Sequence, residues 1–346
     1  MKINKYFGFL YFAGFISVEA CSKRETGPIN PDIEAPDRTA FVKGADISWA
    51  TKMRSEGEEF FTREGKQMEC TELMKEIGMN SVRYRVWVNP SEGWNSKSDV
   101  LAKALIASKL GMRIMIDFHY SDTWADPGNQ NPPVAWSSYD LEEMKDALAD
   151  HTLDVLSTLK SKGVDVEWVQ VGNETPVGML LPIGLIDYNN SNFADLVNAG
   201  YDAVKSVYPE ASVIVHVDKG NDKGRQEYVF DYLKRKSAKY DIMGVSLYPE
   251  LNNWKSYATQ CIDNIKTLGK KYGKPTMICE VGMNHDEVEI SYNLLSYLIE
   301  YGKSQTDGFC KGIFYWEPQA PVGYNGGYTK GAFANGRPTK ALDAFK

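Results

Sequence analysis

Two glutamates, Glu174 and Glu280, each stand close to the end of an apolar run of the sequence. The run 168–171 ends shortly before Glu174, and the run 276–279 leads directly to Glu280. Apolar runs of this length, bounded by glycine and proline, are typical of buried parallel strands. Such strands would bring both carboxyl groups to one edge of a barrel. Two carboxyl groups suit hydrolysis of a glycosidic bond, since one donates a proton and the other attacks the sugar or activates water.

The segments around these glutamates alternate between strand-like and helix-like patterns. We expect strands over 41–48, 81–88, 113–120, 166–172, 212–217, 242–248, 275–281 and 312–316. Apolar residues recur at three- and four-residue spacing, which predicts helices, over 70–77, 100–110, 141–160, 193–207, 226–237, 259–272 and 290–301. Eight strand–helix units within about 300 residues predict an α/β fold, a (β/α)8 TIM barrel forming a single catalytic domain over 40–346. An open doubly wound sheet is the alternative, but no GxGxxG motif follows the first strand.

Polar and aromatic side chains stand at the C-terminal ends of most of these expected strands. The candidates for substrate contact are Asp46, Arg83, Arg85, Trp87, Asp117, His119, Asp122, Trp124, Asn173, His216, Asp218, Tyr248 and Trp316. Alternation along the second strand places Arg83, Arg85 and Trp87 on one face. Any one of these residues is as easily explained by pairing with a neighbour. Their gathering at the same end of so many strands favours a binding site.

Composition sets the class of protein and of partner. The chain has 346 residues, 43% of them hydrophobic and 25% charged, which is ample for one large core. A formal charge of −7 without any basic stripe argues against nucleic acid as a partner. The 8 tryptophans and 20 tyrosines suit the apolar faces of sugar rings, although core packing accounts for most of them. Cys70, Cys261, Cys279 and Cys310 lack metal-type spacing, so we expect small buried side chains.

The N-terminal 20 residues have the pattern of a lipoprotein-type signal peptide. Lys2 and Lys5 precede an apolar stretch too short for a stable membrane anchor, and a small residue precedes Cys21. Cys21 would then carry lipid, and the proline-spaced segment 21–39 would be a flexible tether. The residues before Cys21 match such a processing site imperfectly, so plain signal-peptidase cleavage is the alternative. We expect an exported cell-envelope protein, an outer-membrane lipoprotein at the cell surface or facing the periplasm, whose membrane contact is the lipid anchor alone.

Four segments carry a resemblance to a known family. They are 43–48, 83–90, 117–127 and 169–174, of which 117–127 is the most specific. Together they resemble glycoside hydrolase family 53, the endo-β-1,4-galactanases, and the resemblance extends over 41–346. It implies a retaining TIM-barrel enzyme that cuts β-1,4-galactosidic bonds in galactan or arabinogalactan, polysaccharide or oligosaccharide, without a cofactor.

The resemblance also implies roles for single residues. Glu174 would be the acid/base and Glu280 the nucleophile. Asn173 would hydrogen-bond the 2-hydroxyl of the sugar being cleaved, and Tyr248 with an arginine of the second strand would hold Glu280 ionised. Further substrate contacts would come from Trp316, Asp46, His119, Asp122 and Trp124. A guanidinium beside the nucleophile should push its pKa down, whereas apolar surroundings and the opposing carboxylate should keep the acid protonated.

Two loops depart from this family pattern. Some members carry a calcium loop after the seventh strand, but here 282–287 is compact, and we expect no metal and a solvated helix cap. The loop 323–328 should trim one side of the substrate groove.

The alternatives to a galactanase are another retaining barrel glycosidase, such as a mannanase or cellulase, and a non-catalytic glycan-binding lipoprotein. We expect a monomer.

Overall fold

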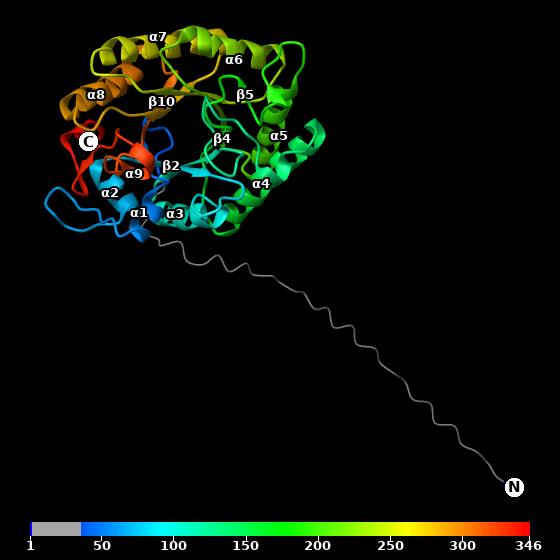
Figure 1. Cartoon of the computed structure of the whole chain (residues 1–346), viewed down its shortest axis with the longest axis horizontal. Coiled ribbons are helices and arrows are strands. Elements are labelled where there is room, and N and C mark those ends of the chain that lie inside the picture. Colours follow the sequence, from blue (N-terminus) through cyan, green and yellow to red (C-terminus); the bar gives the residue numbers. More distant parts are fainter. Residues whose placement is uncertain (2–35) are drawn as a thin grey trace. The chain divides into compact units, whose positions relative to one another are not determined.

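The computed structural model describes Met1 and residues 36–346. The expected signal peptide, 1–20, and all but the end of the expected tether, 21–39, therefore lie outside the described residues. Within the described part, eight parallel strands close into a barrel in the order β1-β10-β9-β8-β7-β4-β3-β2 (Figure 1). The strands are β1 (Val42–Asp46), β2 (Ser81–Val86), β3 (Arg113–Phe118), β4 (Trp168–Val171), β7 (Ser212–Val217), β8 (Ile242–Leu247), β9 (Thr276–Val281) and β10 (Cys310–Trp316). The predicted TIM barrel is confirmed.

Helices surround this barrel, as Figure 1 shows. They are α1 (Ala50–Ser55), α2 (Cys70–Ile77), α3 (Lys97–Lys109), α4 (Leu141–Ser161), α5 (Asn192–Val207), α6 (Lys223–Arg235), α7 (Trp254–Tyr272), α8 (Val288–Gln305) and the short α9 (Tyr324–Gly327). Two small hairpins pair β5 (Gly178–Met179) with β6 (Gly184–Leu185) and β11 (Phe333–Ala334) with β12 (Arg337–Pro338). Single 3-10 turns occur at Val134–Trp136 and Lys340–Phe345. The hairpins, α1 and α9 were not predicted.

Local sequence signals set the limits of several helices. At the start of α4, the Asp140 carboxylate accepts the Glu143 backbone N–H and the Glu143 carboxylate accepts that of Asp140. This reciprocal capping satisfies two of the N–H groups that a helix start leaves free. Helix α2 ends at Gly78, whose φ of 106° is a conformation that glycine adopts without strain. A glycine at this position therefore ends the helix.

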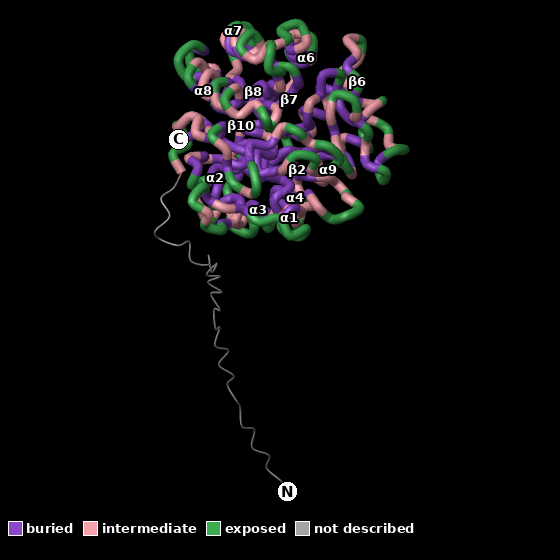
Figure 2. Tube along the Cα trace, turned by 60° about the vertical axis from the view of Figure 1, so that its left-hand side comes forward, coloured by how far each residue is buried: buried purple, intermediate pink, exposed green. Residues whose placement is uncertain are grey.

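The core has two layers, one inside the barrel and one between the barrel and its helices. Figure 2 shows the buried trace in the centre and the exposed trace outside. The inner layer is formed by Val42, Met115, Trp168, Ile214, Ile242, Met277, Cys279 and Phe314. Gly44 makes room for it, because a Cβ there would come within 2.5 Å of the Phe314 ring. Cys70, Cys261, Cys279 and Cys310 are buried and free, as predicted.

Most strands end one or two residues earlier than the apolar pattern indicates, because the chain turns sharply at the tips. Tyr120, Glu174 and Glu317 adopt the left-handed backbone, with φ of 49°, 41° and 48°. This conformation costs a non-glycine residue roughly 1–2 kcal/mol. These three residues lie at the end of the barrel that carries Glu174 and Glu280.

No helix within residues 36–346 is both long and apolar enough to cross a bilayer.

Candidate active site

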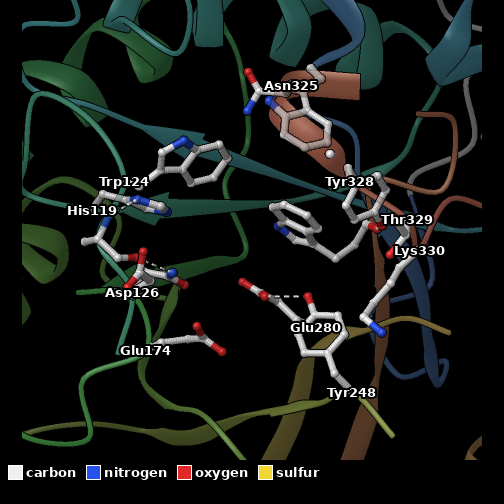
Figure 3. Close-up of a pocket in the computed structure, with 15 residues that line it drawn as sticks. His119, Trp124, Asp126, Glu174, Tyr248, Glu280, Asn325, Tyr328, Thr329 and Lys330 are labelled. Atoms are coloured by element: carbon white, nitrogen blue, oxygen red, sulfur yellow. Dashed lines mark hydrogen bonds between the residues drawn. The ribbon is translucent and has the colours of Figure 1, made fainter. Parts of the chain in front are cut away.

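A cavity of about 580 Å³ opens at the C-terminal ends of the strands (Figure 3). Its lining includes the predicted residues Glu174, Glu280, His119, Trp124, Asn173, Tyr248 and Trp316, together with Trp49, Ala125, Asp126, Asn325, Gly327, Tyr328, Thr329 and Lys330. Figure 3 shows the carboxyl groups of Glu174 and Glu280 pointing toward one another. The structure therefore brings the two predicted catalytic glutamates into one cavity.

Glu280, in β9, is held by two neighbours. Arg83 Nη1 lies 3.0 Å from its Oε1, and the Tyr248 hydroxyl donates to its Oε2 at 2.7 Å. Glu280 is only 5% exposed, and this burial raises the pKa of its carboxyl group to about 7, although Arg83 and Tyr248 both lower it. The guanidinium therefore does push the pKa of Glu280 down, as expected, but burial outweighs it and the net pKa is raised.

Arg83 also serves several carboxylates at once, which limits its effect on Glu280. Its Nη1 donates to Asp46 Oδ2 at 2.7 Å, and its Nη2 donates to Asp117 Oδ2 at 2.8 Å. The charges of Asp46 and Asp117 themselves raise the pKa of Glu280. One cation shared among three carboxylates stabilises each of them less than it would a single partner.

Asn173 is fixed in one orientation of its amide. Its Oδ1 accepts from Arg83 Nη2 at 2.9 Å and lies 2.9 Å from His216 Nδ1, while its Nδ2 donates to the carbonyl of Ala125 at 2.8 Å. Burial lowers the pKa of His216 well below its usual range, so the ring is neutral. Nδ2 keeps a second N–H, which suits a hydroxyl of the bound sugar. The neighbour Gln170 binds Arg83 Nε and Asp117 in the same buried layer.

Glu174 follows directly after Asn173 on a strained turn. Gly172, directly after β4, has a φ of 84°, and Glu174, two residues further on, has a φ of 41°. Burial, and then the charge of Glu280, raise the pKa of Glu174 well above its usual range, although a hydrogen bond with Ser246 lowers it. A carboxyl group that keeps its proton near neutral pH is suited to donate it to a departing oxygen.

The tryptophans that form the aromatic wall of the cavity pack against the guanidinium of Arg85. The centre of the Arg85 guanidinium lies 4.4 Å from the ring centroid of Trp124, 5.1 Å from that of Trp49 and 5.8 Å from that of Trp316. Its Nη1 donates to Glu317 at 2.7 Å. Two of its nitrogens have no hydrogen-bond partner within the described residues, and the indole faces provide favourable contacts for them.

Several predicted contact residues are thus supports beneath the cavity instead of parts of its lining. These are Asp46, Arg83, Arg85, Asp117 and His216, all at most 1% exposed. Asp218 pairs with Arg225 away from the cavity. Asp122 and Trp87 line an adjoining cleft, and the two oxygens of Asp122 accept backbone N–H groups of Asn89 and Val134. His119 lines the cavity and lies 3.0 Å from Asp117 through Nε2.

Sequence reasoning missed some residues that build the site. Gln170 is a polar residue inside an apolar run, which is a usable sign of a buried polar contact. Glu317 directly follows Trp316, and its carboxylate is completely buried with Arg85, Gln319 and the Trp49 N–H as donors. Tyr328 and Lys330 reach the cavity from the loop after β10, a tertiary contact with no local pattern. That loop, including 325 and 327, does line one side of the cavity as expected.

The segment after β9 differs from its expected role. Lys330 Nζ donates to Asn284 Oδ1 at 3.1 Å, and the Asn284 amide donates to Glu250 at 3.3 Å. Helix α8 begins at Val288 without any side-chain cap, so the helix-cap interpretation was wrong. Within residues 36–346 no group of three or more His, Cys, Asp or Glu side chains is placed to hold a metal. The expected absence of a metal stays a prediction.

Comparisons with known proteins place this site in a family. The Glycosyl hydrolase family 53 profile matches residues 42–293. Arabinogalactan endo-beta-1,4-galactanase A of Aspergillus niger is 31% identical over 299 residues, 80% of this chain and 84% of that protein. Endo-beta-1,4-galactanase of Bacillus subtilis (strain 168) is 29% identical over 313 residues, 82% of this chain and 71% of that protein.

Solved structures agree with the sequence matches. A fungal beta-1,4-galactanase superposes with a TM-score of 0.81 at 26% identity, covering 88% of this chain and 99% of the other. The GH53 catalytic domain of Ignisphaera aggregans superposes with a TM-score of 0.80 at 24% identity, covering 92% of this chain and 98% of that domain. The chain therefore belongs to glycosyl hydrolase family 53, as its motifs indicated.

Proposed function

We propose that this protein is a retaining endo-β-1,4-galactanase that hydrolyses galactan and arabinogalactan chains. The observation that carries the proposal is the pair Glu174 and Glu280, which face one aromatic-walled cavity. The family and the galactanase names of its relatives support galactan as the substrate. Opposed glutamates of this kind favour catalysis over the alternative of a non-catalytic glycan-binding protein.

The two glutamates divide the reaction between them. The ionised Glu280, oriented by Arg83 and Tyr248, attacks the anomeric carbon, and a covalent glycosyl–enzyme ester forms as the glycosidic bond breaks. Glu174 gives its proton to the departing oxygen. In the second step Glu174 takes a proton from water, which attacks the same carbon and releases Glu280. The sugar keeps its β configuration, because it is inverted twice.

Chromatography of the products tests the substrate and the nucleophile together. Wild-type protein should release oligosaccharides from purified galactan and leave mannan and cellulose intact. Glu280→Gln should be inactive at nearly unchanged side-chain volume, whereas Glu289→Gln, an exposed control that pairs with Lys340, should keep full activity. Cleavage of mannan or cellulose in preference to galactan would assign the chain to another barrel glycosidase. A Glu280→Gln variant that keeps a tenth of the wild-type turnover would refute the nucleophile.

We also propose that the enzyme is exported and tethered to an envelope membrane through lipid on Cys21. The support is the sequence pattern of residues 1–39. A single acyl chain anchors only marginally, but a multiply acylated cysteine anchors stably. Full-length protein in its host should fractionate with membranes and incorporate labelled palmitate, and Cys21→Ala should abolish both. A soluble wild-type protein whose mature N-terminus lies beyond Cys21 would contradict the anchor and leave the enzyme assignment intact.

A further inference from the structure

A second cavity of about 260 Å³ adjoins the active-site cavity and shares Trp49, Trp124 and Asn325 with it. We call it the β2 cleft, because half of its lining residues follow β2. Its defining residues are Lys52, Trp87, Glu92, Trp94, Asn95 and Trp124. Neither β4 nor β9, which lead to the two catalytic glutamates, contributes to this lining. Whatever binds there lies beyond the sugars that flank the cleaved bond.

Trp94 offers an unused aromatic surface in the β2 cleft. Trp87 and Trp124 pack against each other with ring centroids 5.3 Å apart, and Trp124 also contacts Trp49 and Trp316. Trp94 is half-buried and has no aromatic neighbour within the described residues. A tryptophan face suits the apolar C–H face of a pyranose ring, because the contact buries apolar area on both partners.

Asn95 adds a hydrogen-bond acceptor that lacks a partner. Its side chain is 2% exposed, and no donor among residues 36–346 reaches its Oδ1. Its backbone is fixed, because its N–H donates to Asp99 at 2.8 Å and its carbonyl accepts from the Trp87 N–H at 2.9 Å. An unpaired buried amide oxygen is costly, and native proteins rarely keep one without a reason. Asn95 lines the β2 cleft, and a small turn of its side chain would let a hydroxyl of a bound ligand satisfy this oxygen.

The charged side chains at the edge of the β2 cleft already have partners. Lys52 Nζ lies 3.1 Å from Glu92 Oε2 and 3.9 Å from Glu56. The oxygens of Asp122, which also lines the cleft, are occupied by two backbone N–H groups. Charges that already have partners favour a neutral ligand rich in hydroxyls over a charged one.

We propose that the β2 cleft is a distal subsite, where Trp94 stacks on a galactosyl unit and Asn95 Oδ1 accepts one of its hydroxyls. The inference rests on the proposed galactanase activity and adds to it a preference for long chains. A galactan segment that reaches both cavities gains a contact that a short oligosaccharide cannot make. Trp94 binds substrate away from the reacting atoms, so it should govern chain-length dependence and leave the chemical step unchanged.

The test is kcat/KM of the full-length enzyme on β-1,4-galacto-oligosaccharides of increasing length and on a short aryl galactoside. For the wild type, kcat/KM should rise with length. Trp94→Ala should lose about three- to tenfold on the long substrates, the usual range for one aromatic contact, and nothing on the aryl galactoside. Trp94→Phe should restore most of the loss. Trp254→Ala, a half-buried tryptophan outside both cavities, is the matched control and should change neither.

The outcomes separate the two proposals. If the wild type cleaves galactan but Trp94→Ala has an unchanged dependence on chain length, the distal subsite is refuted and the enzyme assignment stands. A Trp94→Ala variant that loses the same factor on the aryl galactoside, with a lowered melting temperature, refutes the subsite as well. A wild type that leaves galactan intact would refute the proposed function, and with it this inference.

Discussion

Removing the Tyr248 hydroxyl should move the acidic limb of the pH–rate profile to higher pH. The hydroxyl donates to Glu280 Oε2 at 2.7 Å and favours the ionised form of that carboxyl group, whose pKa is about 7. A hydrogen bond to a charged group contributes about 1.5–3 kcal/mol. One pKa unit corresponds to about 1.4 kcal/mol, so Tyr248→Phe should raise the pKa of Glu280 by about 1–2 units. Arg83 still orients the carboxylate, so the site should keep its shape.

The sign of the effect on the pH–rate profile follows from the proposed role of Glu280 as nucleophile. The nucleophile must be ionised, so activity falls as the pH drops through its pKa. Well below pH 7, Tyr248→Phe should therefore reduce kcat/KM about 10- to 100-fold, whereas above the shifted pKa the loss should be much smaller.

The assay is kcat/KM on soluble galacto-oligosaccharide across pH 5–9, for wild type and variant. The control is Tyr208→Phe, which removes a hydroxyl that donates to the Val164 carbonyl at 2.8 Å and lies outside the cavity lining. Tyr208→Phe should leave the pH–rate profile unchanged. A Tyr248→Phe profile that is lowered by one factor at every pH, with an unmoved acidic limb, would refute the argument that this bond sets the pKa of Glu280.

Three further predictions concern the acid, the support layer and metals. Glu174→Ala should lose most activity on galactan but much less on the first step with an activated aryl galactoside, whose leaving group needs little protonation, and azide should partly restore turnover. Arg85→Met should lower the free energy of unfolding, measured by urea titration, by about 3–5 kcal/mol, because Glu317 loses its buried partner. The double variant with Glu317→Gln should recover part of this lost stability, because no unpaired buried charge then remains. EDTA should change neither activity nor melting temperature, and a drop that calcium reverses would contradict this.

The barrel was predictable because its sequence pattern is local. Residues 212–217 and 70–77 were expected as a strand and a helix, and both elements have those limits in the structure. Apolar alternation and glycine stops encode such elements directly. The hairpin of β5 and β6 could not be found in this way, since strands of two residues have no period. Strand tips were placed too late because Tyr120 continues the pattern while its backbone has already turned.

Most residues that form the site were predictable from the sequence, but the role of each one was less so. Alternation placed Arg83 and Arg85 on one face, but their division of labour depends on pairing across the sheet. Asp46 of β1 is in register with Arg83 of β2 on one side and with Trp316 of β10 on the other. Arg83 therefore faces the barrel centre, where its guanidinium reaches Glu280. Arg85, two residues later, lies under the tryptophans. Register of this kind is a tertiary property, and the sequence of one strand does not contain it.

The charges around Glu174 suit its proposed role as acid in the first step and as base in the second. The charges that act on Glu174 come from two carboxylates, Glu280 and Asp218, which raise its pKa, and from one guanidinium, Arg83, which lowers it. With too few cations for the carboxylates, Glu174 keeps its proton for the first step. When Glu280 becomes an ester, its charge disappears and one cause of the raised pKa of Glu174 is removed. Glu174 then holds a proton less tightly, and its carboxylate persists long enough to activate water.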